Sequence, residues 1–184
     1  MMKHFGLLGL GLTLVMALAV IAPGYAMGPM DTAATSHHSR LAQQPLQVGM
    51  VLSITGSGKA YKISDQSTTQ TASISLMVKV DRVSLGRALI TVTSGSLTVG
   101  SDTMTVDSGR GIVNFHSDRM LLKVTVKGTD GTMMHLVLYG KVNGHVSAPI
   151  DTGAGFTVDF LKPQSKLVGK YFLEFPGTTV TRTS

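Results

Sequence analysis

The chain has 184 residues, about the length of one domain, and 43% of them are hydrophobic whereas only 14% are charged. Its formal net charge is +6 without any block of like charge, and aromatic residues make up 5% with no Trp, which argues against a nucleic-acid-binding protein. The absence of Cys excludes a disulfide framework and a lipid-modified cysteine, so the fold must rest on burial alone.

The first 26 residues are typical of an export signal. A short basic start, MMKH, precedes an uncharged apolar run from Phe5 to Ala22, and the small residues of GYA offer a cleavage site after Ala26. The run is nearly long enough to cross a bilayer as a helix, so an uncleaved anchor is the alternative. We therefore expect a protein that is secreted or displayed at the cell surface, with membrane contact only through this segment if it is not removed.

The rest of the chain divides into a linker, a domain and a tail. Residues 27–45 lack apolar periodicity and are rich in small polar residues, which predicts a flexible linker. From Leu46 onward apolar and polar residues alternate, and the spacing of an amphipathic helix is almost absent. These patterns predict a β domain over 46–176 and a C-terminal tail over 177–184.

Three segments, TASISLMVKV, RMLLKVTVKG and KLVGKYFLEF, show the alternation most clearly and predict three strands. Successive side chains of a strand point to opposite faces of the sheet, so one phase of each segment faces the core. The predicted inward residues are Ala72, Ile74, Leu76, Val78 and Val80, then Met120, Leu122, Val124 and Val126, then Leu167, Tyr171, Leu173 and Phe175.

Short turn signals separate these segments, and short links join antiparallel neighbours. A longer segment, 143–155, predicts a crossing or a loop at the end of the sheet. We therefore expect an all-β antiparallel meander of about eight to ten strands, forming a barrel-like fold or a two-sheet sandwich, preceded by an N-terminal signal or anchor helix. The predicted turns are 99–103, 107–111, 116–119, 128–131 and 162–166.

The stretch SITGSGKAYK, residues 53–62, contains the Gly-Lys pair of a phosphate-binding loop. That loop requires a Gly five residues before Gly58 and a hydroxyl after the Lys, but Ser53 and Ala60 stand there. The sequence that follows favours a strand, so no helix N-terminus would bind phosphate. We predict a hairpin turn or a glycine bulge.

Histidines that follow the expected cleavage site are candidates for metal ligation. Tight hairpins at the predicted turns would put His135 beside Val124 and about five residues, roughly 16 Å, from His116, so these two histidines could not share a metal. His116, Asp118 and His145 could converge at one end of the sheet. Further candidates for copper are the stretch MMH, in which Met133 and His135 would face outward and Met134 inward, and His37 and His38.

No nucleophile stands in a recognisable catalytic setting, because Cys is absent and no Gly-x-Ser-x-Gly turn joins a strand to a helix. Asp159 and Glu174 lie on the two arms of the hairpin around 162–166, with Lys162 and Lys170 nearby. A cross-strand charge ladder is favoured over a glycosidase pair. The remaining acidic residues considered fall in turns: Asp65, Asp102, Asp107, Asp118 and Asp130.

Two segments, FTVDFLKPQSKLVGKYFLEF and GRGIVNFHSDRMLLKVTVKG, are similar to segments of small exported β-rich proteins of archaea, a group without a characterised function. They cover a minority of the chain, and their motifs are structural. The resemblance implies export and β architecture, and it implies no functional residue.

We expect an exported, non-catalytic cell-surface or extracellular β domain that acts in binding or assembly, without catalytic residues, cofactors or a bound metal. Its partners would be cell-envelope components, or further copies joined through an edge strand such as QVGMVLSIT, residues 47–55. One alternative is a barrel-type carrier of a small apolar ligand. Its cavity would be lined by Leu76, Leu122, Leu136 and Phe160. A copper- or zinc-binding exported protein is the other alternative.

Overall fold

Nine antiparallel strands in one sheet are formed by residues 44–184, the part of the chain that this computed structural model describes. The all-β expectation is confirmed for these residues. The predicted signal or anchor segment, His37, His38 and nearly all of the linker lie outside the described part. The strands are β1 (Val51–Lys62), β2 (Asp65–Ser84), β3 (Arg87–Val99), β4 (Asp102–Asn114), β5 (Arg119–Lys127), β6 (Met133–Asn143), β7 (Gly155–Phe160), β8 (Lys166–Leu167) and β9 (Tyr171–Arg182).

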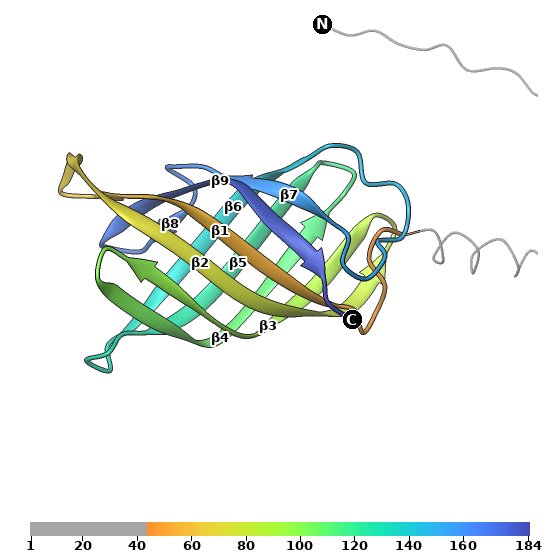
Figure 1. The fold of residues 1–184 in the computed structure, drawn as a ribbon, viewed down its shortest axis with the longest axis horizontal. Coiled ribbons are helices and arrows are strands. Elements are labelled where there is room, and N and C mark those ends of the chain that lie inside the picture. Colours follow the sequence, from red (N-terminus) through yellow and green to blue (C-terminus); the bar gives the residue numbers. More distant parts are fainter. Residues whose placement is uncertain (1–43) are drawn as a thin grey trace, which may run out of the picture. The chain divides into compact units, whose positions relative to one another are not determined.

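The strands follow one another as a meander, and the sheet closes on itself. Each strand from β1 to β6 pairs with the next, β6 pairs with β7 and β8, and both of these pair with β9. β9 then pairs with β1, which completes a ring. In Figure 1, β1, β2 and β9 cross in front of β5 and β6. The segment predicted as an edge strand is therefore not an edge, because β1 is paired on both sides.

The core lies inside the ring and follows the predicted alternation. All of the predicted inward side chains are buried except Tyr171, which is half-buried and packs against the core. Phe160 and Phe175 are the largest of the fully buried side chains. Each buried Leu, Val or Phe side chain contributes about 1.5–3 kcal/mol, so residues 44–184 hold a core sufficient to fold as a unit.

Four of the five predicted turns are confirmed, and the segment 143–155 forms the loop between β6 and β7. The predicted turn at 107–111 is wrong. β4 runs straight through it, with a shift of register against β5 between Val106 and Ser108. The small residues of DSGRG accommodate a bulge in a continuous strand. Within residues 44–184, no helix has the length and hydropathy needed to span a bilayer.

Two predicted boundaries near the C-terminus are also wrong. The segment KLVGKYFLEF is two strands, because Gly169, with φ +78°, turns the chain between β8 and β9. β9 continues to Arg182, past the expected end of the domain at 176. Pro176 and Gly177 resemble a strand terminator, but they form an irregularity inside β9, after which Val180 pairs with Ile54 of β1.

The Gly-Ser-Gly stretch of β1 explains where the ring can close. The register between β1 and β9 shifts between Thr55 and Lys59, so the stretch is a strand with a bulge-like irregularity and not a hairpin turn. A Cβ at Gly58 would lie 1.7 Å from the carbonyl oxygen of Glu174. Glycine is therefore needed at this position because the backbone of β9 approaches so closely.

Candidate binding face on strands β3–β6

An outward-facing apolar row runs across four neighbouring strands. Leu89 of β3 pairs with Ile112 of β4, which pairs with Leu121 of β5, which pairs with Tyr139 of β6. The exposed fractions of Leu89, Ile112 and Tyr139 are 43%, 41% and 38%, and Leu121 is half-buried. We call these four residues the apolar row. Large apolar side chains in one contiguous line are more informative than the same side chains scattered singly over a surface.

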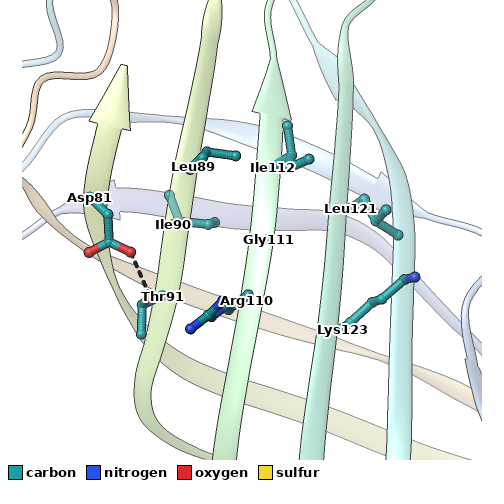
Figure 2. A pocket seen from close by; sticks show the side chains of 9 residues that line it. All are labelled: Asp81, Leu89, Ile90, Thr91, Arg110, Gly111, Ile112, Leu121 and Lys123. Atoms are coloured by element: carbon teal, nitrogen blue, oxygen red, sulfur yellow. Dashed lines mark hydrogen bonds between the residues drawn. The ribbon is translucent and has the colours of Figure 1, made fainter. Parts of the chain in front are cut away.

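The apolar row arises because each strand places these residues in its outward phase. Leu89, for example, lies between the buried Ala88 and Ile90. Figure 2 shows Leu89, Ile112 and Leu121 next to one another on β3, β4 and β5. They line a surface cavity of about 470 Å³. The other lining residues are Asp81, Ile90, Thr91, Arg110, Gly111 and Lys123.

Basic side chains border the apolar row on both sides. Two residues further along each strand in either direction lie the next outward positions, roughly 6.7 Å away. On one side they include Arg110, Lys123 and Lys166, and on the other side Arg87, Arg119 and Lys141. The register that aligns them joins β3 to β4, β4 to β5 and β5 to β6, and extends to β8 for Lys166. We call these two sets of three the basic rows.

The positive charges of the basic rows are not neutralised by acidic partners within residues 44–184. Within the described part of the chain, none of their six side chains makes a hydrogen bond or ion pair, and one of them, Arg119, lies 6.0 Å from the ring centroid of Tyr139. Two carboxylates lie beside the rows. Asp81 accepts a hydrogen bond of 2.5 Å from the Thr91 hydroxyl. Asp159, the cross-strand partner of Lys141, accepts from the Asn143 amide and the Gly177 N–H. The face therefore presents a surplus of unpaired positive charge around an apolar centre.

The candidate metal cluster of His116, Asp118 and His145 does not form. Residues 44–184 contain no group of three His, Asp or Glu side chains that could hold a metal ion. The His116 ring lies against Gly86 in the turn between β2 and β3, whereas His145 is exposed in the loop after β6. His135 pairs with Thr125 instead of the predicted Val124. The loop over residues 128–132 is longer than the tight turn assumed, and this moves the register by one residue.

The predicted charge ladder around residues 162–166 is replaced by hydrogen bonds. Asp159 accepts from the Asn143 amide at 2.8 Å and from the Gly177 N–H at 2.6 Å. Glu174 accepts from the Tyr61 hydroxyl at 2.7 Å, and this bond is the main cause that raises the pKa of Tyr61. Both carboxylates are therefore engaged in bonds that join neighbouring strands.

The remaining predicted residues have structural positions. Met133 is exposed, and Met134 is partly buried against the core, as the alternation predicts. Asp65 and Asp130 accept hydrogen bonds from hydroxyl and backbone groups two or three residues later, which lowers the pKa of each. Such local bonds are the usual role of Asp in turns.

The apolar and basic rows were not predicted from the sequence, because their members are spread along the chain between residues 87 and 166. The usable signal is the outward phase of each strand, in which Arg87, Leu89 and Thr91 alternate with buried residues. Comparison of the chain with protein-family models, with curated proteins and with solved structures finds no match.

Proposed function

We propose that the protein is an exported, non-catalytic β domain that binds an anionic component of the cell envelope through the outer face of β3–β6. The observation that carries this proposal is the apolar row bordered by two basic rows whose charges are nearly all unpaired. Unpaired cations around an apolar centre favour an anionic partner with an apolar part. Export itself is a prediction from the N-terminal sequence.

The other features of the domain support binding over catalysis or transport. The strand carboxylates Asp159 and Glu174 are engaged in hydrogen bonds that join strands. We infer a barrel-like ring with a filled interior, because the core side chains occupy its centre. All four residues expected to line a carrier cavity are fully buried in that core, which argues against the carrier hypothesis.

The proposal is tested by elution of residues 44–184 from a phosphate-bearing cation-exchange resin in a salt gradient. The double variant Arg110→Gln/Lys123→Gln removes two charges from the face. The matched control, Lys59→Gln/Lys62→Gln, removes two exposed charges from β1. We expect the first variant to elute at clearly lower salt than the control, although their net charges are equal. Elution of both variants at the same salt would show that net charge alone governs retention, and the proposal would fail.

Self-association through an edge strand stays a prediction, and the beginning of β2 replaces residues 47–55 as the candidate edge. Asp65, Thr69, Gln70 and Thr71 of β2 are paired with β1 and lie beyond the β3 pairing, which begins at Ala72. An unpaired edge of this kind can receive another strand. Light scattering during size-exclusion chromatography at high concentration tests it, and a strict monomer would contradict it.

A further inference from the structure

The β3–β6 face arranges apolar and cationic side chains in the order found on surfaces that bind at a membrane interface. An apolar stripe with Lys and Arg along its edges places the stripe at the level of the lipid headgroups and the cations against the phosphates. Amphipathic helices carry this pattern on one face. Here a sheet carries it, with the apolar row in the middle and a basic row roughly 6.7 Å away on either side.

The apolar row distinguishes a lipid surface from other anionic partners. An acidic polysaccharide or a nucleic acid would neutralise the basic rows but leave Leu89 and Ile112 without an apolar partner. Stacking of bases or sugar rings needs aromatic side chains, and Tyr139 is the one aromatic residue of the three rows. A second copy of the same face would set basic rows against basic rows, and repulsion opposes that contact.

The flexibility of the basic side chains also favours a bilayer, in which the anionic headgroups are themselves mobile. Lys and Arg side chains that make no bond within the domain have no fixed positions, so they do not form a rigid template for one particular molecule. A bilayer supplies phosphates at many positions, and each long side chain can reach one without ordering the others. Tyr139 has the amphipathic character of residues enriched at membrane interfaces.

We propose that the partner of this face is a bilayer surface containing anionic lipids, an inference that rests on the proposed function. The domain lies with β3–β6 against the headgroups, with Leu89, Ile112 and Tyr139 directed toward the acyl boundary. The basic rows contact the phosphates on either side. This adds a second membrane contact to the one that the sequence predicts for an uncleaved N-terminal segment.

The test is co-sedimentation of residues 44–184 with vesicles, because this part lacks the apolar leader that would bind lipid by itself. Vesicles of phosphatidylcholine alone are compared with vesicles that also contain phosphatidylglycerol. We expect binding to the second kind only, weakened by added salt. Each Lys or Arg near an anionic bilayer contributes about fivefold, so Arg110→Gln/Lys123→Gln weakens binding by roughly 25-fold.

Two further variants separate the lipid from charge alone. Leu89→Thr/Ile112→Thr keeps the net charge and the β propensity of the strands, and we expect severalfold weaker binding because the apolar contact is lost. The control Lys59→Gln/Lys62→Gln should bind as the wild type does. Each variant is first checked for an unchanged urea midpoint. Arg87→Gln/Lys141→Gln replaces the first charge variant if that variant is unstable.

Each outcome decides the inference. Loss of binding in the charge and apolar variants but not in the control supports it. Equal vesicle binding by all variants, or no effect of the Thr substitutions, overturns it. Face-dependent retention on the phosphate resin without vesicle binding overturns the lipid inference and leaves the proposed function intact, with an acidic protein as the next partner to test. If neither resin retention nor vesicle binding depends on this face, both the proposed function and the lipid inference are refuted.

Discussion

Replacement of Gly58 by Ala tests whether β1 and β9 close the ring. The new Cβ would lie 1.7 Å from the carbonyl oxygen of Glu174. An ordinary contact between carbon and a carbonyl oxygen is at least about 3.3 Å, so the two strands must separate by ~1.5 Å at this point. Overpacking of this kind typically costs 1–3 kcal/mol, whereas Ala in place of Gly inside a strand gains roughly 0.5–1 kcal/mol.

Because the new Cβ meets backbone, which cannot swing aside, the upper part of the overpacking range applies, and the expected net effect is a loss of about 1–2.5 kcal/mol in the free energy of unfolding. It is measured by urea denaturation followed by circular dichroism of residues 44–184. Ser57→Ala is the matched control, because Ser57 is the exposed neighbour on the same strand, and its substitution should change stability by less than about 0.5 kcal/mol. If Gly58→Ala were as stable as the wild type or more stable, the backbone of β9 could not lie where the structure puts it, and ring closure at this point would be refuted.

Two further predictions concern hydrogen bonds close to the pairing of β1 with β9. Thr178 is fully buried and its hydroxyl donates to the Phe175 carbonyl at 3.0 Å, so Thr178→Val should lose about 1–3 kcal/mol in urea denaturation, whereas the exposed Thr179→Val should not; equal midpoints would contradict this role. Tyr61 has a pKa raised above 10.0 by its bond to Glu174, so its stabilising contribution is present below that pH and is lost as pH rises through the raised value. Absorbance titration of tyrosinate should therefore show one late-titrating group that disappears in Tyr61→Phe and moves to lower pH in Glu174→Gln; unchanged titration in both variants would refute the bond.

The strands and their buried faces could be predicted because alternation is a local property. Leu76 and Leu122, for example, alternate with polar residues in the sequence, and this alternation is enough to predict that they face the core. Turn signals failed where small residues had another use. The glycines in DSGRG and around Gly58 accommodate bulges and close approach inside continuous strands, and Pro176 does not end β9. Whether a glycine turns the chain or admits a neighbouring backbone depends on that neighbour, which is distant in sequence.

The candidate site could not be predicted for a related reason. The sequence by itself indicated the outward direction of Lys123, whereas Arg110 stood in the segment wrongly predicted as a turn, and the basic residues form no run of like charge along the chain. Only the register between strands decided that Leu89, Ile112 and Leu121 stand in one row with cations on both sides. Register is fixed by loop lengths and by the closing of the ring through β1 and β9, and a shift of one residue would change which side chains are neighbours. The local sequence determines on which face of its strand a side chain lies, and the pairing of the strands determines which side chains become its neighbours.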